Sequence, residues 1–191
     1  MTRRDSIVFA AALLASPGCR PGGRSAPRTP QERYDRETSD LKGATDPYKR
    51  WVALGGAAKA ALAIGRDSEA KSYAEELQRL APSYTKDWNY GNAIQDFNIV
   101  LGATALKAGD VETARKHLLD AGRSPGSPQM DTFGPNMTLA KALLDAGERD
   151  VVLEYFELCR QFWDMHRGRL DEWRDDVKSG RTPAFGANLV Y

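Results

Sequence analysis

Apolar residues recur at helical spacing along most of this chain, and the clearest instance lies in residues 99–125. There Ala114, Leu118 and Ala121 stand at positions i, i+4 and i+7, which places them on one face of a helix. Gly109-Asp110 interrupts the pattern and predicts a tight turn. The stretch therefore predicts two short helices that are joined by a turn and packed through their apolar faces.

The same plan predicts two further helix pairs. One pair spans residues 48–64 and 67–80, with Gly65 at the turn. The other follows a loop at residues 123–135 and turns at Gly147. The inner faces of these two pairs carry small or apolar residues at steps of three and four, namely Ala70, Ala74, Leu77, Leu139, Ala140, Leu143, Val152, Phe156 and Cys159. Each pair is expected to bury this face against its neighbours.

A final helix is predicted over residues 161–178. Its apolar stripe consists of Trp163, His166, Leu170, Trp173 and Val177. The opposite face is charged, which is typical of a terminal helix that caps a stack of helices. Residues 179–191 contain proline and glycine and show no helical period, so we expect an extended C-terminal tail. The apolar residues of this tail that we expect to pack onto the helices are Phe185, Leu189 and Tyr191.

The spacing from Leu101-Gly102 through Gly109 to Ala114 and Ala121 resembles a tetratricopeptide repeat, a helix–turn–helix unit of about 34 residues. The resemblance covers roughly residues 51–163. It implies an all-α fold in which antiparallel helix pairs stack as a short right-handed solenoid, closed by a C-terminal capping helix. The three turn glycines lie 44 and 38 residues apart, so the repeats would be divergent, with insertions between them.

Residues 1–18 have the pattern of an export signal. The positive start Thr2-Arg3-Arg4 precedes an apolar run at residues 7–15, which is too short to cross a bilayer, since a crossing takes about 20 residues. Gly18-Cys19 after this run resembles a bacterial lipoprotein processing site, where the cysteine thiol is acylated and becomes the new N-terminus. The alternative is a buried or disordered N-terminal helix. We expect a flexible linker at residues 19–45, because its first part is rich in proline, glycine and serine.

Composition adds little that is specific. The 191 residues are 41% hydrophobic and 28% charged, which fits one soluble helical domain at residues 46–178. The formal net charge of +1 gives no bulk argument for nucleic acid as a partner. Contact with a membrane would therefore rest on a lipid at Cys19 and not on electrostatics.

The sequence shows no catalytic or metal-binding signature. Cys159 lies among apolar residues on a predicted helix, without the base that a nucleophilic thiol needs, so we expect a buried structural cysteine. His117 and His166 belong to no metal-ligand motif, and the glycines follow no nucleotide-binding pattern. The many carboxylates fit solvated helix faces. We therefore expect no enzyme activity, no metal and no cofactor.

The loop at residues 125–137 is a candidate functional segment. It is longer than a repeat connection requires and contains three prolines, and loops of this kind often carry function. Its segment F-G-P-N-M at residues 133–137 is echoed by F-G-A-N-L at residues 185–189 of the tail. The alternative interpretation is that Gly-x-Asn serves turn or helix-cap geometry in both places.

In tetratricopeptide domains the first helices of the pairs line a groove that holds a peptide. By register, the resemblance places a set of amides and single charges on or near this groove, namely Lys59, Asn92, Asp96, Asn98, Asn136 and Lys141. Gln129 and Phe133 of the loop complete the candidate binding set, with Tyr90 and Phe133 as apolar anchors. Amide side chains both donate and accept hydrogen bonds, so they suit the main chain of an extended peptide.

We expect an exported, non-catalytic interaction scaffold at the bacterial cell envelope, periplasmic or lipid-anchored, that binds a protein or peptide partner in this groove. Two alternatives stay open. A helical envelope enzyme such as a hydrolase would need a deep pocket with converging carboxylates, or an exposed Cys159. A structural subunit of an envelope assembly would be favoured by an extended apolar patch and by self-association.

Overall fold

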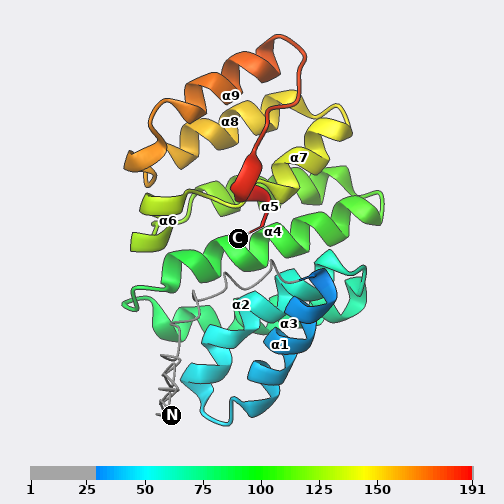
Figure 1. The fold of residues 1–191 in the computed structure, drawn as a ribbon, viewed down its shortest axis with the longest axis vertical. Coiled ribbons are helices and arrows are strands. Elements are labelled where there is room, and N and C mark those ends of the chain that lie inside the picture. Colours follow the sequence, from blue (N-terminus) through cyan, green and yellow to red (C-terminus); the bar gives the residue numbers. More distant parts are fainter. Residues whose placement is uncertain (1–28, 191) are drawn as a thin grey trace, which may run out of the picture.

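The computed structural model describes residues 29–190, and over this range the protein is all-helical, with helices packed against each other and no β-strand. Figure 1 shows the helices stacked along the long axis of the molecule, from α1, α2 and α3 at one end to α8 and α9 at the other. The predicted all-α class is therefore confirmed. The architecture is repeat-like and compatible with a tetratricopeptide-like protein.

Helix α1 (Pro30–Gly43) corrects one prediction. It lies within the range 19–45 that we expected to be a flexible linker, so that prediction is wrong for the residues of this helix. Although α1 is strongly polar, Tyr34, Thr38 and Leu41 stand at positions i, i+4 and i+7 and are buried. These three side chains form one continuous face, which docks the helix on α2.

Polar contacts along α1 add to this docking. Thr29 and Glu32 form a capping box that satisfies the first backbone N–H groups of the helix. The hydroxyl of Tyr34 donates a hydrogen bond of 2.8 Å to Glu69 on α3 (Asp67–Leu80). The guanidinium of Arg66 lies 4.7 Å from the centroid of the Tyr34 ring, a cation–π distance. Helix α1 is thus part of the folded domain.

Helices α2 (Pro47–Ala63) and α3 form the first predicted pair. The side chain of Asp46 caps α2, and Gly65 makes the turn between the helices with φ of 78°. Four small residues of α2 are almost completely buried, namely Ala57, Ala58, Ala60 and Ala61. Because these side chains are short, the backbones of α3 and α4 can come close to α2. The 3₁₀ helix η1 (Ala81–Tyr84) follows α3.

Helices α4 (Tyr90–Lys107) and α5 (Val111–Gly122) form the middle pair. Helix α4 separates the two hydrophobic clusters of the molecule, since Val100 belongs to the N-terminal cluster and Ile99 to the C-terminal one. Gly102 permits a close approach of helices, because a Cβ atom there would lie 2.3 Å from a leucine methyl group of the third pair. The central position of α4 explains why it is apolar on more than one face.

The third pair consists of α7 (Thr138–Asp145) and α8 (Arg149–Cys159), with Gly147 at the turn and φ of 89°. The loop that we expected at residues 123–135 contains a short helix, α6 (Pro128–Phe133), so it is only partly a loop. The side chain of Ser127 caps α6 by accepting from the N–H of Met130, and proline occupies the first helical position.

The predicted single helix over residues 161–178 is wrong. Arg167 and Gly168 both have positive φ, 51° and 84°, and this left-handed pair breaks the helical hydrogen bonding. Two elements result, the 3₁₀ helix η2 (Asp164–His166) and α9 (Arg169–Lys178). The predicted apolar stripe is nevertheless buried at Trp163, Leu170, Trp173 and Val177. His166 is half-buried.

The C-terminal tail runs back from α9 across the helical stack (Figure 1). Its end forms a 3₁₀ helix, η3 (Gly186–Leu189), where we expected only extended chain. Phe185 is 3% exposed and lies beside the rings of Phe156 and Trp173, while Leu189 is partly buried on the same cluster. The expected packing of the tail is confirmed for Phe185 and Leu189.

Several sequence expectations concern residues outside the described range. The signal peptide at residues 1–18, the lipidation of Cys19 and the packing of Tyr191 belong to this group, so they stay predictions. Among the helices of residues 29–190, none is both long and apolar enough to cross a membrane.

Candidate functional site

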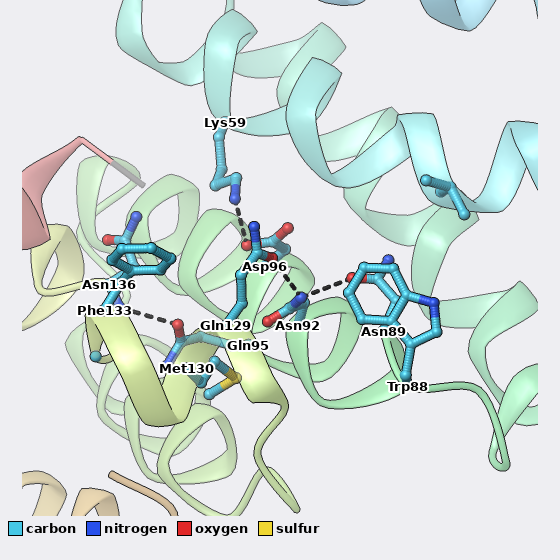
Figure 2. A pocket seen from close by; sticks show the side chains of 12 residues that line it. Lys59, Trp88, Asn89, Asn92, Gln95, Asp96, Gln129, Met130, Phe133 and Asn136 are labelled. Atoms are coloured by element: carbon cyan, nitrogen blue, oxygen red, sulfur yellow. Dashed lines mark hydrogen bonds and ion pairs between the residues drawn. The ribbon is translucent and has the colours of Figure 1, made fainter. Parts of the chain in front are cut away.

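A cavity of about 370 Å³ opens between α2, α4 and α6. Helix α2 supplies Lys59, and the start of α4 supplies several amides and one carboxylate (Figure 2). The loop before α4 and the segment from α6 to α7 complete the lining. The lining residues are Val52, Lys59, Trp88, Asn89, Asn92, Gln95, Asp96, Gln129, Met130, Phe133, Gly134 and Asn136.

Six of the eight candidate binding residues line this cavity, namely Lys59, Asn92, Asp96, Gln129, Phe133 and Asn136. Asn98 does not, because it lies two residues beyond Asp96 and therefore projects from another side of α4. It is buried, and its side chain contacts His117 at 2.7 Å. Lys141 is also elsewhere, since its ammonium forms an ion pair of 2.7 Å with Asp145 along α7. These two residues therefore lie outside the cavity.

The two charged residues of the cavity neutralise each other. Lys59 Nζ lies 2.7 Å from Asp96 Oδ1, and both side chains are mostly buried, at 28% and 14% exposure. The pair joins α2 to α4. Gly55 makes room for it, because a Cβ atom at this position would stand 2.4 Å from Asp96 Oδ2. The cavity therefore presents no net charge from its lining side chains.

Asn92 holds the opposite wall together. Its amide nitrogen donates to Oδ1 of Asn89 at 2.6 Å and to Oε1 of Gln129 at 2.9 Å. Its oxygen accepts from the hydroxyl of Ser127 at 2.6 Å. One side chain of α4 thus fixes the loop and α6 against the helix. Asn92 uses most of its hydrogen-bonding capacity inside the protein, so it positions its neighbours more than it offers contacts.

The floor of the cavity rests on a buried polar network that the sequence analysis missed. Gln95 is 4% exposed, and its oxygen accepts from the backbone N–H of Asn136 at 2.9 Å. The Gln95 amide nitrogen donates to the hydroxyl of Tyr155 at 3.3 Å, and this hydroxyl donates to the backbone oxygen of Asn136 at 3.0 Å. Burial raises the pKa of Tyr155 well above its usual value, so the hydroxyl stays protonated as a donor.

The two similar segments, F-G-P-N-M at residues 133–137 and F-G-A-N-L at residues 185–189, each carry an asparagine with a structural role. Asn188 of the tail is 1% exposed and donates to the backbone oxygens of Phe133 at 3.0 Å and Pro135 at 2.9 Å. Its own backbone oxygen accepts from the N–H of Met137 at 2.8 Å. The oxygen of the Asn136 side chain accepts from the N–H at the start of α7 at 2.8 Å. Asn136 thus makes the helix-start contact of the alternative interpretation, whereas the side chain of Asn188 makes long-range contacts through which the tail holds one wall of the cavity.

Apolar side chains stand at the rim. Trp88 is 60% exposed, Phe133 is 52% exposed and Val52 is 42% exposed, high values for large apolar residues. Trp88 precedes α4 and was missed by the sequence analysis, because an isolated tryptophan in a polar segment carries no periodic signal. Tyr90, the other predicted anchor, does not line the cavity.

The groups considered for catalysis lie apart from this cavity. Its lining contains one carboxylate, which pairs with Lys59, and no histidine, cysteine or hydroxyl side chain. Cys159 is completely buried and has a free thiol whose pKa is raised by burial. The pKa of His117, on α5, is lowered mainly by burial. The arrangement suits hydrogen bonding and apolar contact with a ligand.

Comparison with protein families, with curated proteins and with solved structures found no match for this chain.

Proposed function

We propose that this protein is a non-catalytic interaction scaffold, and that the cavity between α2, α4 and α6 holds an extended peptide segment of a protein partner. The observation that carries the proposal is the convergence of six candidate binding residues, chosen from the sequence alone, on one cavity. A polar lining with apolar side chains at the rim is the usual composition of a binding site that orients its ligand by hydrogen bonds.

The fold supports this role. In the proposed arrangement the helix pairs α2–α3, α4–α5 and α7–α8 are antiparallel and stack as a short right-handed solenoid with α9 as the cap. Stacked pairs of this kind create elongated surfaces on which a peptide can lie. The first helices of two successive pairs, α2 and α4, both contribute to the cavity, which is the placement that the tetratricopeptide resemblance implies.

Absence of catalysis is part of the proposal. An acid–base mechanism needs two groups whose pKa values are separated and which converge on one cleft, and the cavity lining supplies a single, ion-paired carboxylate. A nucleophilic mechanism needs an activated hydroxyl or thiol, and Cys159 is buried in the core. Binding requires none of these groups.

The proposed location is the bacterial cell envelope, with the mature chain anchored through a lipid on Cys19. This part rests on the sequence of residues 1–19 alone. Cys19→Ser should either leave the chain unprocessed or move the protein out of the detergent phase on phase separation. Recovery of wild-type protein in the aqueous phase with an unmodified thiol would refute the anchor.

Site-specific photo-crosslinking tests the binding role. A photoreactive phenylalanine analogue at Phe133, at the rim of the cavity, should attach to a protein partner in living cells, and the attachment should map to one short segment of that partner. The same analogue at Lys116, an exposed position of α5 outside the cavity, is the matched control. Equal adducts at both positions, or none at position 133, would refute the proposal.

A further inference from the structure

The cavity has an excess of hydrogen-bond donors. Asn92 donates to the amide oxygens of both Asn89 and Gln129, so the two oxygens face Asn92 and each amide nitrogen lies at the other end of its group. Within residues 29–190 no acceptor contacts either of these nitrogens. Each nitrogen carries two N–H groups.

One acceptor atom on each of three cavity side chains is already engaged. Asp96 pairs with Lys59 at 2.7 Å, and the oxygen of Asn92 accepts from Ser127. The oxygen of Gln95 accepts from the backbone of Asn136. Because the charges of Lys59 and Asp96 cancel and the amide nitrogens of Asn89 and Gln129 offer donors, a complementary ligand is uncharged and rich in acceptors. Every donor that the ligand carried in excess would lose its bond to water without replacement on binding.

Among peptide segments, a proline-rich stretch fits this description. A proline residue has a carbonyl oxygen but no backbone N–H, so each proline adds an acceptor without a donor. In the polyproline II conformation the carbonyl groups have no internal partners and remain available. A saccharide fits less well, because each of its hydroxyl groups donates as well as accepts.

The apolar side chains at the rim of the cavity suit contact with the proline rings of such a segment. Polyproline II segments dock on aromatic surfaces, and here the exposed ring of Trp88 stands at the α4 side of the cavity while Phe133 stands at the α6 side (Figure 2). The conformation is already formed in the free peptide, so binding costs little ordering entropy. A site built from rigid helices and a fixed amide bridge is suited to a rigid ligand.

We propose that the partner segment held between α2, α4 and α6 is an uncharged proline-rich stretch in the polyproline II conformation, whose carbonyl oxygens accept from the amide nitrogens of Asn89 and Gln129 and whose rings contact Trp88 and Phe133. This inference rests on the proposed function and specifies the chemistry of the partner.

Tryptophan fluorescence provides the assay. Of the four tryptophans, Trp51, Trp163 and Trp173 are at most 5% exposed, so quenching by acrylamide in solution reports mainly on Trp88. Three probes are added to the full mature chain, namely a capped oligoproline, a capped glycine–serine peptide of the same length and an uncharged disaccharide. Oligoproline should protect Trp88 from the quencher in a saturable manner, and the other two probes should not.

Isosteric substitutions test the role of the donors. Asn89→Asp combined with Gln129→Glu replaces each NH₂ group by an oxygen, while each residue keeps the oxygen that accepts from Asn92. The affinity for oligoproline should fall by at least about tenfold. The matched control, Gln78→Glu combined with Gln161→Glu, adds the same charge at exposed positions outside the cavity and should leave binding unchanged. Thermal melting confirms that both double variants are folded.

The outcomes separate this inference from the proposed function. Equal protection by the glycine–serine peptide would overturn the proline specification and leave peptide binding intact. Unchanged affinity of the folded double variant that carries Asn89→Asp and Gln129→Glu would overturn the donor argument. Protection by the disaccharide alone would overturn both proposals. If no probe protects Trp88, the inference fails, and the crosslink at position 133 decides the proposed function independently.

Discussion

Gly55 offers a direct test of the contact that builds one wall of the cavity. Replacing it with alanine adds a Cβ atom 2.4 Å from Oδ2 and 3.2 Å from Cγ of Asp96. Both distances are shorter than van der Waals contact, so the carboxylate has to rotate or α2 has to move away from α4. Either movement disturbs the 2.7 Å ion pair between Lys59 and Asp96.

Two opposing effects set how much Gly55→Ala changes the free energy of unfolding. Overpacking of a tight contact costs about 1–3 kcal/mol. Alanine in place of glycine inside a helix stabilises by about 0.5–1 kcal/mol. Gly55→Ala should therefore lower the free energy of unfolding by about 1 kcal/mol, which corresponds to a fall in Tm of roughly 2–4 °C for a chain of this size.

Removal of the Asp96 carboxylate should reverse the sign of the effect that Gly55→Ala has on stability. In an Asp96→Ala background only the Cβ atom of residue 96 remains, 3.4 Å away, and this is ordinary contact. Gly55→Ala should then stabilise the protein, giving a coupling free energy of about 2 kcal/mol between the two positions in a double-mutant cycle. Gly43→Ala is the matched control, because nothing lies within 4 Å of a Cβ atom there, and it should be neutral or stabilising.

Urea denaturation of the four variants of the cycle measures these free energies. A coupling energy close to zero would refute the reasoning, since it would mean that α2 and α4 do not approach at Gly55 as described. A loss of stability in Gly43→Ala as large as that in Gly55→Ala would show that the penalty comes from the backbone and not from the contact with Asp96.

Three other predictions concern buried polar groups. Cys159 should react with a thiol reagent only at the rate of global unfolding, because burial both covers its thiol and raises its pKa; labelling of the native protein as fast as a free cysteine would contradict this. Asn188→Ala removes two hydrogen bonds to the loop and should cost about 1–3 kcal/mol in urea denaturation, and an unchanged midpoint would argue against the tail as a clamp. His117 has a lowered pKa in the folded state, so its contribution to stability is complete above its unfolded pKa of about 6.5 and falls as the pH drops below it. His117→Gln should flatten the dependence of Tm on pH in this window, and an identical profile would refute the assignment.

The helices and turns of this protein follow from local patterns. Apolar residues at steps of three and four defined α3, whose bounds Asp67–Leu80 match the predicted range 67–80. Gly65, Gly109 and Gly147 were expected at the turns, and each has positive φ, a conformation that residues with a Cβ atom avoid. These features depend on neighbours within a few positions along the chain, so the sequence alone determines them.

Other elements were missed because their signal is weak or depends on distant partners. Helix α1 buries only Tyr34, Thr38 and Leu41 in an otherwise charged segment, and the surface of α2 and α3 selects that face. The break at Arg167 and Gly168 lies inside a regular apolar stripe, so periodicity could not reveal it. For α1, tertiary contacts outweigh the average pattern of the segment.

The candidate site also combines features that the sequence determines with features that only the tertiary structure decides. The sequence supplied amides and single charges on the first helices of successive pairs, and most of them meet at the cavity. Only the tertiary structure decided which groups pair and which remain available, because the amide bridge through Asn92 and the ion pair of Lys59 with Asp96 join segments 37 residues apart in each case. The orientation of an amide depends on the partner that it finds, and this partner comes from another part of the chain.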